Sequence, residues 1–214
     1  MNCSKESMTL YAVTDRHWLG EKTLVQAAEE CLKGGATFLQ LREKHLDKVR
    51  FLAEAIALKK LAQKYGVPFV VNDDVEIALA CGADGVHVGQ DDMESGMARA
   101  KIGPGKILGV SAHSVEEARR AVERGADYLG VGAVFPTGTK DDATYLSYDE
   151  LKAIRAAVSV PVVAIGGISA ANIAALSGTG IDGVAVVSAL FAQPDIERAA
   201  RELKKLALEA FYHV

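Results

Sequence analysis

A cluster of polar side chains follows the apolar stretch that begins at Phe38. The chain reads Gln-Leu-Arg-Glu-Lys over residues 40–44. If this segment continues a strand, alternation places Gln40, Arg42 and Lys44 on one side. Arginine offers a two-pronged donor and lysine a compact charge, and the pair suits a diphosphate. A solvated Arg-Glu-Lys surface is the alternative that this segment alone leaves open.

Acidic residues follow two further apolar stretches, as Asn-Asp-Asp at 72–74 and Gln-Asp-Asp at 90–92. One carboxylate from each cluster could bind Mg²⁺, which typically takes one or two protein carboxylates and completes its shell with water and phosphate oxygens. Such an ion would neutralise charge on a leaving diphosphate. Carboxylates also favour helix starts, which gives some of them a purely structural role. The stronger metal candidates are Asp73 and Asp92, and the stronger helix-start candidates are Asp74 and Asp91.

The next apolar stretch ends at Ser111 and is followed by Ala-His-Ser. Ser114 and Glu117 have the spacing of a capping box, so Ser114 is expected to begin a helix. An imidazole at His113 could transfer protons, and a histidine that only packs is an equally good interpretation.

Later segments carry groups typical of phosphate binding. The loop at 135–143 has two hydroxyls, a glycine and a lysine, which suit closure over a phosphorylated ligand. Gly-Gly at 166–167 and Val-Ser at 187–188 follow two more apolar stretches, where backbone amides and a short helix could hold phosphate. The chain therefore has two expected anion sites, one cationic and metal-assisted, the other built mainly from backbone.

Eight short apolar stretches must position these groups. Nearly continuous apolar runs are typical of parallel strands covered on both faces, and the longer amphipathic stretches between them predict crossover helices. Ser147 and Glu150 have capping-box spacing and predict one helix start. The predicted strands are Leu10–Val13, Phe38–Arg42, Phe69–Asn72, Gly85–Val88, Ile107–Ser111, Tyr128–Val131, Val162–Ile165 and Gly183–Val187.

An internal repeat indicates that these strands close into a barrel. Every second strand is preceded by Gly-Ala-Thr, Gly-Ala-Asp or Gly-Ile-Asp, at 35–37, 82–84, 125–127 and 180–182. The glycine suits a helix C-cap with positive φ. Four copies of a unit with two strands give an α/β protein of the (β/α)₈ TIM-barrel class, whose strand ends gather the polar groups at one face. A doubly wound six-stranded sheet is the competing architecture.

Bulk composition agrees with one domain over residues 1–214, in which residues 1–8 are expected to be a flexible or peripheral segment. The chain has 214 residues, half of them hydrophobic, and a net charge of -4, which gives no general attraction to nucleic acid or anionic membrane. Three cysteines without metal-ligand spacing fit buried, reduced thiols and a cytoplasmic location. No apolar run approaches the length of a membrane span or a signal peptide.

Taken in order, these motifs resemble the thiamine phosphate synthase family, from the first strand to the eighth. The matching segments are Gln-Leu-Arg-Glu-Lys at 40–44, Val-Asn-Asp-Asp at 71–74, His-Val-Gly-Gln-Asp-Asp at 87–92, Gly-Val-Ser-Ala-His at 109–113, Pro-Thr-Gly-Thr-Lys at 136–140, Ala-Ile-Gly-Gly-Ile at 164–168 and Val-Val-Ser at 186–188.

The resemblance implies a transferase that joins hydroxymethylpyrimidine diphosphate to hydroxyethylthiazole phosphate, with Mg²⁺ on Asp73 and Asp92. Diphosphate leaves first in this family, and the thiazole nitrogen captures the pyrimidine cation. The implied catalytic residues are Arg42, Lys44, Ser111 and Lys140. The implied contacts to the pyrimidine diphosphate are Gln40, Leu41, Arg42, Glu43, Lys44, Asn72, Ser111 and Lys140, and those to the thiazole phosphate are Thr137, Gly138, Thr139, Gly167, Val187 and Ser188.

Three points stay open at the level of sequence. The segment Thr144–Ser147 lacks the Pro- or Gly-containing turn expected in the family, which bears on loop closure. A thiazole tautomerase-like isomerase that uses His113, and a phosphate-ligand sensor without catalysis, are the alternative functions. Monomer and homodimer are both compatible with the sequence.

Overall fold

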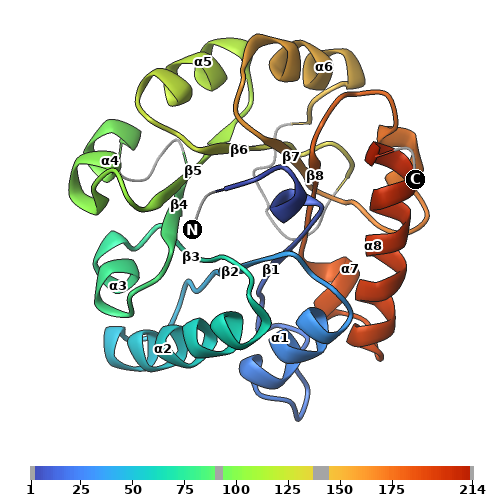
Figure 1. Cartoon of the computed structure of the whole chain (residues 1–214). Helices are drawn as coiled ribbons and strands as arrows, with labels where there is room; N and C mark the ends of the chain where they lie inside the picture. Colours follow the sequence, from blue (N-terminus) through green and yellow to red (C-terminus); the bar gives the residue numbers. More distant parts are fainter. Residues whose placement is uncertain (1–2, 90–93, 137–144, 213–214) are drawn as a thin grey trace.

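Eight parallel strands form a closed barrel in chain order in the computed structural model, which describes residues 3–89, 94–136 and 145–212. Figure 1 shows the helices as a ring around this barrel. The predicted (β/α)₈ class is therefore confirmed. The strands are β1 (Leu10–Val13), β2 (Phe38–Leu41), β3 (Phe69–Asn72), β4 (Gly85–Val88), β5 (Ile107–Ala112), β6 (Tyr128–Val131), β7 (Val162–Ile165) and β8 (Gly183–Val186).

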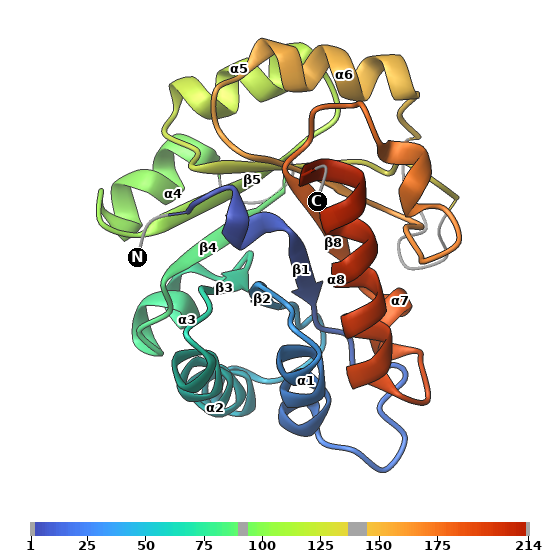
Figure 2. The same ribbon diagram turned by 45° about the vertical axis from the view of Figure 1, so that its right-hand side comes forward.

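The helices cover the outer face of the sheet, and α8 packs beside α1 across the junction between β1 and β8 (Figure 2). A 3₁₀ helix, η2, stands between β7 and β8, where the other strand pairs have an α-helix. The helices are α1 (Leu24–Lys33), α2 (Lys48–Tyr65), α3 (Val75–Ala80), α4 (Ser95–Ile102), α5 (Val115–Glu123), α6 (Tyr148–Ala157), α7 (Ser188–Phe191) and α8 (Ile196–Tyr212), with 3₁₀ helices η1 (Glu6–Met8) and η2 (Ile173–Leu176).

Two apolar clusters hold the barrel together. The larger fills the space between strands and helices, and the smaller fills the barrel interior with inward side chains such as Tyr11, Phe38 and Tyr128. Met8 belongs to the inner cluster and is fully buried, and Cys3 packs against that cluster. Within the segment 1–8, which we expected to be flexible or peripheral, residues 4–6 are exposed, and Met8 is the residue that packs into the amino-terminal end of the barrel.

The repeated lead-in clamps neighbouring strands together. The third residue of each repeat uses its side chain to accept a hydrogen bond from a backbone amide at the start of the preceding strand. Its own amide donates to the carbonyl of the same residue. The four pairs are Thr37 with Leu10, Asp84 with Phe69, Asp127 with Leu108, and Asp182 with Val162.

The glycine of each repeat has the positive φ that was predicted, from 68° at Gly82 to 100° at Gly35. Three of the four end an α-helix, because the amide after each glycine bonds back to a carbonyl five residues earlier. Gly180 differs, since η2 and not an α-helix precedes it.

The two predicted capping boxes have different outcomes. Ser147 and Glu150 form a complete box at the start of α6. Ser114 accepts from the amide of Glu117 and begins α5 as expected, but the Glu117 carboxylate accepts from the amide of His113, one residue before the cap. The second box is therefore wrong in its reciprocal half.

The three thiols are free, with Cys31 buried and Cys3 and Cys81 partly buried. Burial raises the pKa of Cys3 to about 12. Among the described residues, no helix is long and apolar enough to cross a membrane.

Candidate active site

A chain of hydrogen bonds crosses the barrel interior and joins two of the predicted site residues. Gln40 of β2 donates from Nε2 to the Tyr11 hydroxyl at 2.6 Å. The Tyr11 and Tyr128 hydroxyls are 2.6 Å apart, and the Tyr128 hydroxyl is 3.0 Å from Nδ1 of His87. Nε2 of His87 is 3.0 Å from Oγ of Ser111. Side chains from five strands therefore form one continuous polar row.

Glycines make the space for this row. A Cβ atom at Gly109 would lie 2.2 Å from the Tyr128 ring and 2.5 Å from Nδ1 of His87. At Gly130 it would lie 3.2 Å from the His87 ring. Burial raises the pKa of both Tyr11 and Tyr128, so each phenol keeps its proton.

The cations predicted after β2 lie beyond the end of the strand. β2 ends at Leu41, so alternation does not extend to Arg42 and Lys44 as we expected. Nη1 of Arg42 lies 3.8 Å from Oδ2 of Asp15, in the loop after β1, and both side chains are about one-fifth exposed. Lys44 is exposed. After β2, the rim of the barrel mouth thus carries Arg42, which is near Asp15, and Lys44, which is exposed to solvent.

The side chains of Leu41 and Glu43 have partners within the protein. Leu41 is fully buried in the outer cluster, between the sheet and the helices. Glu43 accepts from Nε of Arg16 at 2.7 Å, and Arg16 also bonds Glu54 at 2.6 Å. In this structure one side chain packs against helices and the other is paired with Arg16, and their predicted contact with the substrate stays a prediction.

Two neighbouring aspartates at the end of β3 have different environments. Asp73 adopts φ 63°, its amide donates to the His87 carbonyl at 2.8 Å, and its carboxylate accepts from the Asn72 side chain. Asp74 accepts from the amide of Ile77 at 2.9 Å and caps α3, as expected for a helix-start carboxylate. Asp74 is therefore the helix-start carboxylate, and the Asp73 carboxylate lies beside Asn72.

The predicted thiazole-phosphate side of the mouth is built on β7 and β8. Gly166 and Gly167 turn the chain with φ of 98° and 64°, and the carbonyl of Gly167 accepts from Asn172 at 2.9 Å. A Cβ atom at Gly167 would lie 2.4 Å from the Pro136 carbonyl, so the turn packs directly under the start of the β6 loop. Val187 and Ser188 stand at the start of α7.

Several predicted residues cannot be placed. Asp92, Thr137, Gly138, Thr139 and Lys140 lie outside the described residues, as do Asp91 and Thr144. Beyond them, Leu146 is buried and its amide donates to the Ala133 carbonyl at 2.9 Å, so the end of the unusual segment is anchored. No group of three or more His, Cys, Asp or Glu side chains that could hold a metal occurs within the described ranges.

His113 lies at the start of α5, outside the polar row. Its Nδ1 is 3.3 Å from the Glu117 carboxylate, one helical turn away, and about a third of its side chain is exposed.

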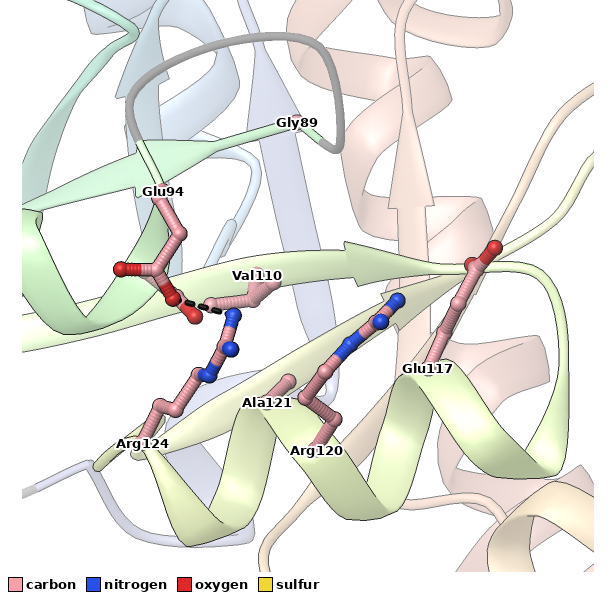
Figure 3. Close-up of a pocket in the computed structure, with 8 residues that line it drawn as sticks. Gly89, Glu94, Val110, Glu117, Arg120, Ala121 and Arg124 are labelled. Carbon is pink, nitrogen blue, oxygen red and sulfur yellow. Dashed lines mark ion pairs between the residues drawn. The ribbon is translucent and has the colours of Figure 1, made fainter.

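A hollow of about 220 Å³ lies outside the barrel, between the outer face of β5 and helices α4 and α5 (Figure 3). Arg124 of α5 pairs with Glu94 in the turn before α4, and Arg120 and Glu117 project from the same face of α5. Backbone amides of Gly96 and Met97 help to hold the pKa of Glu94 below its usual range. Two carboxylates offset two guanidinium groups here, so this hollow lacks the net positive charge that a phosphorylated substrate requires.

Five residues with partners around the site were not predicted from the sequence: Tyr11, His87 and Tyr128 in the middle of the polar row, and Arg16 and Asn172 in loops. The first three had a usable signal, since each is a polar ring at an inward position of a strand that is otherwise apolar. Arg16 and Asn172 are loop residues whose partners are distant in sequence or backbone groups, and composition carries no signal for such contacts.

Comparison with known proteins gives a consistent result. The family model described as thiamine monophosphate synthase matches residues 10–190. A thiamine-phosphate synthase of Ruminiclostridium cellulolyticum is 51% identical over 203 residues, covering 95% of this chain and 97% of the relative. That of Clostridium botulinum is 48% identical over 202 residues, covering 94% and 95%. The solved thiamine phosphate pyrophosphorylase of Pyrococcus furiosus superposes with a TM-score of 0.89 at 40% identity, covering 96% of this chain and 98% of that one.

Proposed function

The chain belongs to the thiamine monophosphate synthase family, and from this premise we propose how its barrel mouth performs the reaction. The activity is that of a thiamine-phosphate synthase, a transferase that joins a pyrimidine diphosphate to a thiazole phosphate and releases diphosphate. What we propose is the assignment of residues, the metal and the order of steps.

The observation that carries the assignment is the convergence of Gln40, Asn72 and Ser111 at the carboxyl ends of β2, β3 and β5. Gln40 is 4% exposed and Ser111 lies at the end of the buried polar row. This depth favours contact with the pyrimidine ring. Arg42 and Lys44 stand at the rim, where a diphosphate remains accessible, and Lys140 is proposed to join them from the β6 loop.

We assign Mg²⁺ to Asp73 and Asp92. The fit rests on Asp73, because its positive φ and its bond to the β4 backbone set a carboxylate beside Asn72 and next to the start of the β4 loop. A hard oxygen donor at this place suits Mg²⁺. When bound, the ion would neutralise charge on the diphosphate.

The thiazole phosphate is assigned to Gly167, Val187 and Ser188, together with Thr137, Gly138 and Thr139 of the β6 loop. The turn at Gly166 and Gly167 lies directly against the base of that loop, which supports a shared ligand. Backbone amides there can donate to phosphate oxygens without a charged side chain.

In the proposed reaction, the bond between the pyrimidine methylene carbon and the diphosphate oxygen breaks first. The electron pair leaves with the diphosphate, and Arg42, Lys44 and Lys140 stabilise the growing negative charge. The thiazole nitrogen then donates its lone pair to the methylene carbon of the pyrimidine cation. The chain's remaining contribution is to hold the two substrates so that nitrogen arrives before water.

We also infer where the protein acts and which molecules it binds. Three free thiols support a reducing, cytoplasmic location. We infer small phosphorylated molecules as the partners, with no role for nucleic acid or membrane. Both monomer and homodimer are compatible with this assignment.

The test is to incubate the purified protein with both substrates and Mg²⁺ and to measure thiamine phosphate and diphosphate. Both products are expected in equal amounts. Arg42→Ala should lower turnover about 100-fold, whereas Arg50→Ala, which changes an exposed arginine on α2, should leave it unchanged. Absence of product from folded protein that binds both substrates would support the sensor, and isomerisation of a thiazole phosphate that depends on His113 would support the tautomerase.

A further inference from the structure

The row from Gln40 to Ser111 has a direction that follows from proton counting. The Nε2 atom of Gln40 can only donate, so the Tyr11 hydroxyl accepts from it. Tyr11 has one proton of its own, and because Nε2 of Gln40 cannot accept it, the acceptor in this arrangement is the Tyr128 hydroxyl 2.6 Å away. Tyr128 has then accepted one bond and donates its own proton to Nδ1 of His87.

The direction fixes the tautomer of His87. An imidazole that accepts at Nδ1 carries its proton at Nε2, and this proton points to Ser111 Oγ at 3.0 Å. Ser111 accepts from His87, so its own proton is directed to a group other than His87. At the other end, this direction requires that the Gln40 amide turns its nitrogen toward Tyr11.

We propose that Tyr11, Tyr128 and His87 are positioning residues. The direction of their hydrogen bonds fixes which donor and acceptor groups Gln40 and Ser111 present to the pyrimidine substrate. This inference rests on the proposed function for its last step, because Gln40 and Ser111 are assigned to that substrate. The row itself does not depend on it. The row also requires Gly109, since any side chain there would displace Tyr128 and His87.

Histidine tautomers provide the first readout. In protein labelled with ¹⁵N at histidine, two-bond ¹H–¹⁵N spectra distinguish a proton on Nε2 from a proton on Nδ1, and His87→Gln identifies the His87 signals. The wild-type protein should show the Nε2–H form of His87 alone. The Nδ1–H form in the wild-type protein would overturn the proposed direction.

Breaking the row in the middle provides the second readout. Tyr128→Phe keeps the ring and removes one hydroxyl, so His87 should populate both tautomers, and the KM for the pyrimidine diphosphate should rise about tenfold. The KM for the thiazole phosphate should stay within about twofold of wild type, since β7 and β8 are not part of the row. Tyr11→Phe breaks the next link and should raise the same KM.

Tyr65→Phe is the matched control, because it removes a tyrosine hydroxyl that bonds Glu29 in the helix layer. It should change neither readout. An unchanged KM in folded Tyr128→Phe, or an equal rise in both KM values, would overturn the positioning role. If the wild-type protein makes no thiamine phosphate, the proposed function fails while the tautomer measurement still decides whether the row exists.

Discussion

The adjacent carboxylates of Asp73 and Asp74 have different surroundings, and we propose a metal-binding role for Asp73 alone. Both follow β3 and both are acidic, and Asp74 accepts from the amide of Ile77 in α3, whereas the Asp73 carboxylate accepts from the Asn72 side chain. Asp73 adopts φ 63°, a conformation that few residues other than glycine, asparagine and aspartate take readily. The backbone therefore directs the two carboxylates to different partners.

The first prediction tests the proposed metal-binding role of Asp73. Asp73→Asn keeps the size and the left-handed backbone but removes the charge, so turnover should fall about 100-fold or more with weakened Mg²⁺ binding. Its free energy of unfolding should change by less than about 0.5 kcal/mol. Steady-state kinetics over a Mg²⁺ titration and urea unfolding measure the two effects.

The neighbour supplies the control. Asp74→Ala removes the cap of α3 and should lower the free energy of unfolding by about 1 kcal/mol, while turnover stays near wild type. Undiminished turnover in Asp73→Asn would remove this residue from the proposed metal site.

At the scale of elements, the four clamps join the start of each odd strand to the lead-in of the next. Asp84 is the example whose lysine partner is itself largely buried. It accepts from the Phe69 amide at 2.9 Å and from Lys59 of α2 at 2.7 Å, and the Lys59 and Asp84 side chains are only 10% and 15% exposed. The Asp84 carboxylate thus links β3 and α2 to the turn before β4.

The second prediction follows from that burial. Asp84→Ala leaves a buried ammonium and a strand amide without their acceptor, and should lower the free energy of unfolding by about 3 kcal/mol. Glu76→Gln breaks an ion pair with Lys48 whose side chains are more than 70% exposed, and should cost less than about 0.5 kcal/mol. Denaturant unfolding of both variants measures the contrast, and equal losses would mean that the clamp is no stronger than a surface pair.

The whole barrel was predictable because its rules are local. Continuous apolar runs, capping serines and the repeated glycine each signal their element directly, and all eight strands lie within one residue of their predicted ends. The site was only partly predictable. Arg42 and Lys44 lie past the end of β2, where alternation no longer applies, and the pairing of Glu43 with Arg16 joins two loops that are neighbours only because β1 pairs with β2. Likewise, the burial of Met8 follows from the closed barrel and not from its neighbours in sequence.

Closure itself has a steric requirement at Gly183, the first residue of β8. Here the last strand meets the first, and a Cβ atom would lie 1.9 Å from the Met8 carbonyl oxygen and 2.8 Å from Cα of Thr9. Gly85, the first residue of β4, has the same relation to the Ile107 carbonyl, so the requirement recurs half a barrel away. Gly183 does not have a positive φ. Glycine is required here because the backbone of Met8 and Thr9 lies too close for a side chain.

Gly183→Ala should therefore push β1 and β8 apart and lower the free energy of unfolding by about 3 kcal/mol, with loss of the packing around Met8. Gly105→Ala is the matched control, because Gly105 is exposed, no atom lies within 4 Å of its added Cβ, and its φ is not positive. That control should stay within about 0.5 kcal/mol of wild type. Urea unfolding with near-ultraviolet circular dichroism follows both. If Gly183→Ala were as stable as Gly105→Ala, the junction would have room for a side chain, and closure would depend on the clamps and on α8 instead.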